Sequence, residues 1–104
     1  MISYPLIKKT AQKIGEILHP KKIILFGSYC NGNPKKDSDV DLLVVLSEKH
    51  NSSKKYTEIS KILEPRHFPM DLLIHTTKEI NKRIKMGDTF IKDILENGKV
   101  LYGS

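Results

Sequence analysis

The chain has 104 residues, and its 18 Lys and Arg against 12 Asp and Glu give a formal net charge of +6. With 38% hydrophobic and 29% charged residues it has the composition of an ordinary globular protein, which argues against a disordered, collagen-like or disulfide-stapled chain. This length predicts a single domain over residues 1–104, with one core and no room for a second domain that would hold a substrate.

Composition also bounds the setting in which the protein works. No apolar run approaches the roughly 20 residues of a membrane span, and the N-terminus lacks the basic and apolar segments of an export signal. Cys30 is the only cysteine and cannot form an internal disulfide, so we expect a cytoplasmic protein. The lysines occur as scattered pairs, which are typical of solvated faces, and we expect no direct nucleic-acid binding.

A helix and two strands are predicted first along the chain. Apolar residues at helical spacing predict a helix over about 5–19, which Pro20 ends. Residues 23–26 are apolar and largely β-branched or aromatic, and they predict a buried strand that stops at a glycine turn. Val40–Leu46 is apolar at nearly every position, which predicts a second strand covered on both faces.

A second helix and a third strand come next. Capping side chains at 51–53 open this helix, and Pro65 requires it to stop by residue 64. Residues 70–74 then predict a strand that is apolar except for Asp71. The helix is expected to carry four side chains on one side: Tyr56, Ile59, Ile62 and Leu63.

Two short helices and a brief strand complete the chain. Residues 76–79 match a capping box, and Gly87 closes the helix that they open. Asp88 can cap a last helix that ends at 97–98, before a strand at 99–102. The order of elements predicts an α/β (α+β) fold, in which helices pack on a small mixed sheet. The inward side chains of the last helix are expected to be Phe90, Ile91, Ile94 and Leu95.

Three carboxylates point to metal-assisted chemistry. Side chains two apart on a strand share a face, so Asp39 and Asp41, roughly 6–7 Å apart at their backbones, can turn toward the same ions. If the strand of Asp71 lies beside Val40–Leu46, a third acid faces the first two, as in two-metal phosphoryl transfer. Unpaired buried carboxylates are costly, and Mg²⁺ is the natural cation to neutralise them. The plainer interpretation is that Asp39 caps a turn and Asp41 lies at an exposed edge.

The turn after the first strand supplies the other half of such a site. Gly27 lets the backbone approach a triphosphate closely, and the amides that follow, with the Ser28 hydroxyl, can donate to phosphate oxygens. Alone, a Gly-Ser pair after a strand is usually just a turn. Its combination with the downstream acids is what makes it informative.

Two segments resemble a known family. Together they resemble the signature of the minimal nucleotidyltransferase (MNT) domain, the smallest branch of the polymerase β-type superfamily, which includes the MntA-like antitoxins of HEPN/MNT toxin–antitoxin pairs. The likeness extends over most of the chain, including the acidic third strand and the short terminal strand. The segments are Ile24-Leu25-Phe26-Gly27-Ser28-Tyr29 and Asp37-Ser38-Asp39-Val40-Asp41-Leu42-Leu43-Val44.

This resemblance implies a polymerase β-like nucleotidyltransferase fold and a role for each candidate residue. Asp39 and Asp41 would hold Mg²⁺, with two ions expected. Asp71 would complete the metal site and help to activate the attacking hydroxyl, while Gly27 and Ser28 would bind the triphosphate of ATP. Family members transfer a nucleoside monophosphate from a nucleoside triphosphate to a hydroxyl, and pyrophosphate leaves.

A partner is implied as well. Stand-alone members of this size are typically antitoxins encoded beside a HEPN-domain ribonuclease, and members are known to place AMP on a tyrosine of that toxin. The resemblance therefore implies an adenylyltransferase that acts as an antitoxin and forms a hetero-oligomer with its toxin. Two alternatives stay open: an antitoxin that neutralises its toxin by binding alone, and a transferase for a small molecule or RNA, which usually requires an added domain.

The chain departs from the family pattern at one position. Many relatives carry Gly-Ser-x-Ala-Arg-Gly, whereas Asn31 stands where the arginine would be. The chain therefore lacks the positive charge with which that arginine helps to bind the triphosphate. Lys35 or Lys36 can supply a point charge, without the fork geometry of arginine, although a solvated loop is the plainer interpretation. His75 can point toward the active face, and Cys30 lacks the paired histidine that nucleophilic catalysis requires.

Overall fold

The computed structural model describes residues 2–35, 38–63 and 68–103. Every helix and strand expected from the sequence is found, in the expected order, which confirms an α/β fold with a small mixed sheet. The elements are α1 (Tyr4–Leu18), β1 (Lys22–Phe26), β2 (Val40–Leu46), α2 (Ser52–Ile62), β3 (Met70–Thr76), α3 (Thr77–Lys85), α4 (Thr89–Asn97) and β4 (Lys99–Gly103).

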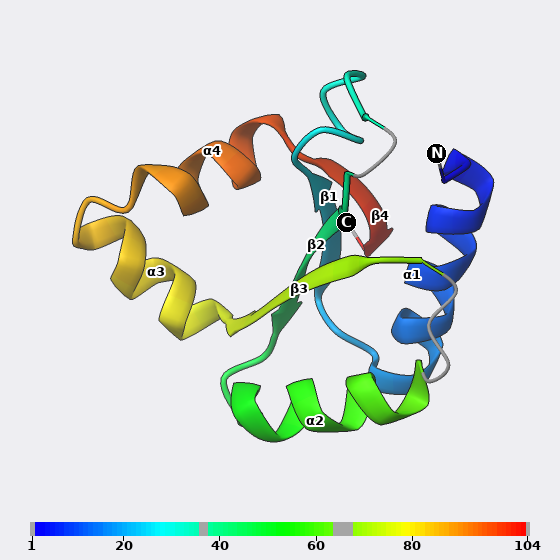
Figure 1. Ribbon diagram of the computed structural model, residues 1–104. Coiled ribbons are helices and arrows are strands. Elements are labelled where there is room, and N and C mark those ends of the chain that lie inside the picture. Colours follow the sequence, from blue (N-terminus) through cyan, green and yellow to red (C-terminus); the bar gives the residue numbers. More distant parts are fainter. Residues whose placement is uncertain (1, 36–37, 64–67, 104) are drawn as a thin grey trace.

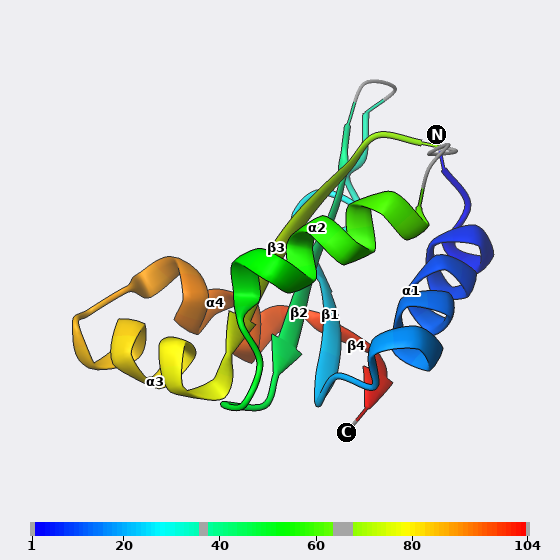
Figure 2. The same ribbon diagram turned by 90° about the horizontal axis from the view of Figure 1, so that it is seen from below.

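The sheet has the strand order β3-β2-β1-β4. The helices α1 and α2 lie on one side of it and α3 and α4 on the other, as Figure 1 and Figure 2 show. β1 pairs antiparallel with both β2 and β4, whereas β2 and β3 run parallel, because α2 supplies the crossover connection that parallel neighbours need. The C-terminal end of β1 therefore meets the N-terminal ends of β2 and β3 at one end of the sheet.

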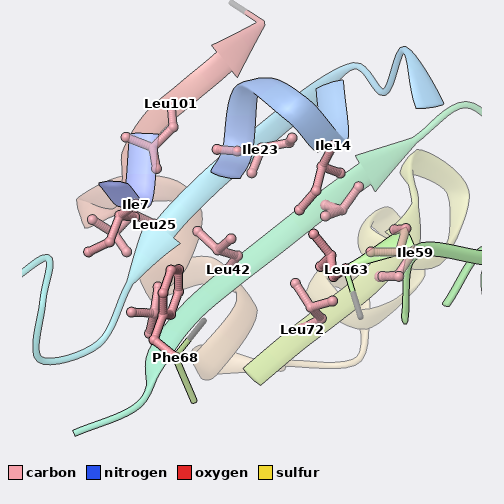
Figure 3. Packing of buried hydrophobic residues seen from close by; sticks show 14 of the residues in the cluster. Ile7, Ile14, Ile23, Leu25, Leu42, Ile59, Leu63, Phe68, Leu72 and Leu101 are labelled. Carbon is pink, nitrogen blue, oxygen red and sulfur yellow. The ribbon is translucent and has the colours of Figure 1, made fainter. Parts of the chain in front are cut away.

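The larger core lies between the sheet and the helices α1 and α2. It joins Leu42 of β2 with Ile7 and Ile14 of α1 and with Ile59 of α2 (Figure 3). None of these four side chains is more than 2% exposed. Burying an aliphatic side chain of this size contributes roughly 1.5–3 kcal/mol, so this face supplies most of the packing that holds the fold together.

The opposite face of the sheet carries a smaller core. Leu43 and Val45 of β2 belong to it, together with Ile91 and Ile94 of α4. Asp41 lies two residues before Leu43 on the same strand face, where a carboxylate takes the place of an apolar side chain. On β2, the apolar contact with α3 and α4 thus ends at Leu43, before the acidic end of the strand.

The predicted caps are present at α2, α3 and α4. Asn51, Thr76 and Asp88 accept hydrogen bonds from the backbone amides three residues further on, at 3.1, 3.2 and 3.0 Å. At α3 the capping box is complete, because a Glu79 oxygen accepts the Thr76 amide at 2.7 Å. These side chains satisfy donors that the first turn of a helix otherwise leaves unpaired.

Several side chains expected to face the core are exposed instead. Phe90 is 54% exposed, Leu95 is 37% exposed and Tyr56 is 44% exposed. α4 has nine residues and presents only the narrow stripe of Ile91 and Ile94 to the sheet, so its neighbouring apolar side chains lie on the flanks. The apolar period was right about the helix and wrong about the width of its inner face.

Two further findings concern the end of α2 and the character of the described helices. α2 ends at Ile62, and the predicted stop at Glu64 and Pro65 lies outside the described residues, as does the side chain of Ile62. Among the helices in the described part of the chain, none combines the length and the apolar character needed to cross a membrane.

Candidate active site

The three acidic residues stand at the end of the sheet where β2 and β3 begin. Asp39 directly precedes β2, Asp41 is its second residue, and Asp71 is the second residue of β3. In the parallel register Asp41 pairs directly with Asp71, so both side chains leave the same face of the sheet. A backbone hydrogen bond of 3.1 Å from the Val40 amide to the Pro69 carbonyl continues the pairing up to Asp39.

The glycine turn lies at the same end of the sheet. Phe26 is the register partner of Asp41, so the turn that follows β1 lies against that carboxylate. Gly27 has a φ of +77°, and a Cβ on it would overlap the Asp41 Oδ2 atom. Glycine alone meets both demands without strain. The Gly27 carbonyl accepts the amides of Cys30 (3.1 Å) and Asn31 (3.0 Å), which closes the turn.

Negative charge accumulates around Asp41. Partial burial raises the pKa of the Asp41 carboxyl, and the charges of Asp71 and Asp39 raise it further. All three influences act in the same direction, so ionising Asp41 costs free energy in the folded protein. A perturbed carboxyl of this kind at an open end of a sheet is typical of a functional site.

The donor set fits a hard divalent cation. Three carboxylates offer oxygen ligands, which Mg²⁺ prefers, and a cation would relieve the repulsion that raises the pKa of Asp41. In the described part of the chain, no three Asp, Glu, His or Cys side chains are already close enough together to hold an ion. Asp39 and Asp71 are exposed, so their carboxylates are accessible to an ion from solvent.

A cavity of about 110 Å³ lies beside the glycine turn. Gly27 lines one side of it, and Phe90 and Asn97 of α4 line the other. The ring of Phe90 meets Phe26 edge to face, with the ring centroids 5.7 Å apart and an angle of 80° between the planes. The apolar period of α4 had placed Phe90 in the core, and no local signal in the sequence indicates its position at this cavity.

Larger hollows lie elsewhere on the surface. One of about 590 Å³ runs along α3, and one of about 530 Å³ runs along α1. Lysine side chains stand in the walls of both, and none of the three acids lines either hollow. The volume of a hollow alone therefore does not identify the active site. The three carboxylates and the glycine turn identify it.

His75 lies apart from the three acids. It shares a strand face with Asp71, but four residues at about 3.3 Å each separate the two positions. Burial lowers the pKa of His75, and the nearby charge of Arg83 from α3 lowers it further. The Nδ1 atom is buried and has no hydrogen-bond partner among the described residues. His75 is thus on the active face of the sheet but against α3.

The remaining candidates fall in the glycine turn and the loop after it. The Ser28 carbonyl accepts the Asn33 amide at 3.1 Å, and the partly exposed side chain of Ser28 borders the turn. Cys30 donates its thiol to the Asn97 carbonyl at 3.6 Å, which is a packing contact with the end of α4. Asn31 and Lys35 are exposed. The other two positions noted in this loop, Lys36 and Asp37, lie outside the described residues.

Comparison with known sequences supports a transferase. Two proteins of Methanocaldococcus jannaschii are similar to this chain, and each is named a "putative protein adenylyltransferase". The first, MJ0604, is 33% identical over 82 residues, which cover 79% of this chain and 78% of the relative. The second, MJ0141, is 37% identical over 71 residues, which cover 66% of this chain and 71% of the relative.

Solved structures share the fold. A toxin–antitoxin structure with AMP-PNP has a TM-score of 0.62 and 22% identity, covering 93% of this chain and 73% of its own. A mutant of the toxin–antitoxin pair MntA-HpeT has a TM-score of 0.61 and 21% identity with the same coverage. A chain from Sulfolobus solfataricus, described as a "putative nucleotidyltransferase", has a TM-score of 0.57 and 18% identity, covering 75% of this chain and 70% of its own.

The family model for the nucleotidyltransferase domain matches residues 7–102, which include the glycine turn and all three acids. The match extends over nearly the whole chain and agrees with the resemblance of the two motif segments. The chain is therefore a nucleotidyltransferase and belongs to the nucleotidyltransferase domain family.

Proposed function

We propose that this protein is a Mg²⁺-dependent adenylyltransferase that transfers AMP from ATP to a hydroxyl of a partner protein. The observation that carries the proposal is the cross-strand row in which Asp41 pairs with Asp71 while its carboxylate lies against Gly27. The names of the two archaeal relatives, and the fold shared with a toxin–antitoxin structure that contains AMP-PNP, support adenylyl transfer.

Each residue has a task in this reaction. Asp39, Asp41 and Asp71 would hold up to two Mg²⁺ ions, which when bound supply positive charge at the phosphates and orient the reacting oxygens. Gly27 and Ser28 bind the triphosphate through the backbone and hydroxyl donors of the turn. The acceptor oxygen attacks the α-phosphorus, its proton passes to the Asp71 carboxylate, and the bond to pyrophosphate breaks.

The acceptor is proposed to be a tyrosine of a HEPN-type ribonuclease toxin, which this chain would neutralise as an antitoxin. A minimal nucleotidyltransferase domain has little surface with which to enclose a separate substrate, which favours an acceptor hydroxyl presented by a folded partner. The two toxin–antitoxin neighbours of similar fold agree with such a complex. The net charge of +6 favours an acidic partner surface.

Asn31 affects how tightly the triphosphate of ATP is bound. The arginine that many relatives carry there is replaced by a neutral side chain on an exposed loop, so the triphosphate is held with less positive charge. Lys35 is exposed on the same loop and is the described residue that can supply a point charge. We expect Asn31→Arg to tighten ATP binding and Lys35→Ala to weaken it.

The proposal is tested by the intact mass of the neighbouring gene product after incubation with this chain, ATP and Mg²⁺. An increase by one or more AMP units is expected with the wild-type chain and none with Asp39→Asn. Glu16→Gln is the matched control, because it removes an exposed acid from α1 on the opposite side of the sheet. If Asp39→Asn transferred AMP as fully as the wild type, the proposed function would be wrong.

A binding-only antitoxin is the second candidate, favoured by Asn31 at the arginine position. The same experiment separates the two. If the partner gains no mass, forms a stable complex and loses its toxicity with wild-type and Asp39→Asn alike, neutralisation proceeds by binding. If suppression of toxicity requires Asp39, it proceeds by transfer.

A further inference from the structure

We propose that the cavity between the glycine turn and α4 receives the base of the nucleoside triphosphate, and that the ring of Phe90 is the surface on which the base stacks. The inference rests on the proposed nucleotidyl transfer and extends it to a side chain outside the motif segments. It assigns a ligand, a nucleobase, to a cavity of about 110 Å³ that opens beside the phosphate-binding turn.

The cavity adjoins both parts of the reaction centre. Gly27 lines it directly, and Gly27 also lies against the Asp41 carboxylate. Phe26, which pairs with Asp41 across the strands, lines it as well and holds the Phe90 ring edge to face at 5.7 Å. A nucleotide bound at the turn therefore lies next to this cavity.

The ring of Phe90 stays largely accessible to solvent although its edge-to-face contact is with Phe26. Its ring is 54% exposed, whereas Ile91 and Ile94 on the same helix are 1% and 2% exposed and supply the contact with the sheet. Phe90, Ile94 and Asn97 follow at i, i+4 and i+7 on α4, so they form one stripe along the cavity. A partly exposed aromatic ring on an apolar wall suits the flat face of a nucleobase.

The negative charge of Asp93 favours a neutral base over the phosphates as the occupant of this cavity. Asp93 lines the cavity, and its carboxylate repels phosphate groups, which keeps the triphosphate on the side of Gly27 and Ser28. The Asn97 Nδ2 atom donates to Asp93 Oδ1 at 2.7 Å, so the two side chains are held together at the end of the stripe. Carboxylate and amide oxygens there can accept from the amino groups on the edge of a base.

The test compares two probes, ATP and inorganic tripolyphosphate, each with Mg²⁺, by isothermal titration calorimetry on the full chain. Phe90→Leu keeps an apolar contact with Phe26 but removes the ring. We expect it to weaken ATP binding roughly 5- to 150-fold, the range that loss of one base–aromatic stack produces, and to change tripolyphosphate binding less than about twofold. Phe90→Tyr, which keeps the ring, should bind ATP as the wild type does.

Leu95→Ala is the matched control, since Leu95 is a 37% exposed apolar residue of the same helix and does not line the cavity. It should change neither affinity. If Phe90→Leu leaves ATP binding unchanged, or weakens both probes equally, the base does not stack on Phe90 and the inference is overturned. If the wild-type chain binds neither probe, the proposed function fails, and this inference with it.

Discussion

At the residue scale, the position of the Asp41 carboxylate depends on the absence of a side chain at Gly27. A methyl group there would overlap Asp41 Oδ2, and the φ of +77° adds backbone strain. We expect Gly27→Ala to lower the free energy of unfolding by about 1–2 kcal/mol, mainly through backbone strain, because the Asp41 carboxylate can turn aside. The rate of AMP transfer should fall roughly 100-fold, because a displaced carboxylate misplaces the reacting groups. Urea unfolding and product mass against time measure the two effects.

Gly87 offers the matched control for this substitution. Its φ is +87°, but nothing lies within 4 Å of a Cβ built on it. Gly87→Ala should therefore cost only the strain of the left-handed backbone, about 1–2 kcal/mol, and leave the rate of transfer unchanged. Equal loss of activity in the two variants would contradict a specific dependence of Asp41 on Gly27.

Asp41 should destabilise the fold that it serves. Burial, Asp71 and Asp39 raise its pKa above the unfolded value of 3.8, so above pH 3.8 the unfolded state loses its proton first. Stability then falls as the pH rises, until the pH passes the folded pKa, and the full penalty is present at neutral pH. We expect Asp41→Asn to raise the free energy of unfolding at neutral pH by up to about 1 kcal/mol, after allowance for solvent screening, while abolishing transfer.

Thermal unfolding checks this prediction. A gain of that size corresponds to a rise in Tm of roughly 4–8 °C or less for a chain of this length. The difference between Asp41→Asn and the wild type should vanish well below the unfolded pKa of 3.8, where Asp41 of the wild type is protonated in both the folded and the unfolded state. Glu16→Gln, at an exposed position of α1, should leave Tm nearly unchanged. A lower Tm for Asp41→Asn at neutral pH would show that the carboxylate stabilises the fold instead.

At the scale of the elements, the capping box of α3 links a strand and two helices. Glu79 accepts the Thr76 amide at 2.7 Å, where β3 passes into α3, and it also accepts the hydroxyl of Ser52 from α2. We expect Glu79→Ala to lower the free energy of unfolding by about 1–2 kcal/mol, because it leaves these donors unpaired. The transfer rate should not change, since the box and Asp71 lie at opposite ends of β3.

Urea unfolding and the initial rate of transfer measure these two quantities. Glu96→Ala serves as the control, because Glu96 is an exposed residue of α4 whose pairing with Lys92 spans 4.0 Å. It should cost less than about 0.5 kcal/mol. A large loss of activity in Glu79→Ala at temperatures well below unfolding would show that the two ends of β3 are coupled.

The sequence predicted the elements well because their signals are local. The capping box at Thr76 and Glu79, for instance, acts within four residues and can be recognised without knowing the fold. Strand pairing is different, since the direct register of Asp41 with Asp71 depends on how α2 packs across the sheet. From the sequence, Asp71 faces the other two acids only if its strand lies beside β2. The observed register of β2 and β3 shows that it does.

The exposure of Phe90 shows that the sequence pattern of a helix alone does not decide which of its apolar residues is buried. A nine-residue helix carries too few turns for its apolar period to single out which residues face inward, and Phe90 and Ile91 satisfy it equally well. The docking of α4 on the sheet decides between them, and it places Ile91 in the core and Phe90 at the cavity. A side chain that the structure associates with the site was therefore assigned to the core.

At the scale of the whole molecule, the two faces of the sheet divide stability from chemistry. The larger core lies with α1 and α2, whereas Asp41 and Asp71 lie on the other face of the sheet, beyond Leu43 of the smaller core. Substitution of an acid should thus leave the larger core intact. This separation is what allows the variants proposed above to report on chemistry without unfolding the chain.

Acid should weaken the whole fold first through His75. Burial lowers its pKa below the unfolded value of 6.5 and Arg83 lowers it further, while Glu79 and Asp88 act in the opposite direction. As the pH falls through 6.5 the unfolded state takes up a proton before the folded state does, so stability declines until the pH passes the folded pKa. The lowered pKa values of Glu48, Glu79 and Asp88 act in a separate window, because those contributions are lost only below unfolded values of 4.5 or 3.8.

His75→Gln isolates this contribution, because glutamine is polar and does not titrate. Between about pH 7.5 and about pH 5.5 the wild type should lose more stability than His75→Gln, by up to about 1 kcal/mol for a half-buried group. Urea unfolding at the two pH values gives the difference. If His75→Gln kept the full wild-type decline, the proton would be taken up elsewhere, and the burial of His75 against α3 would not control the response to acid.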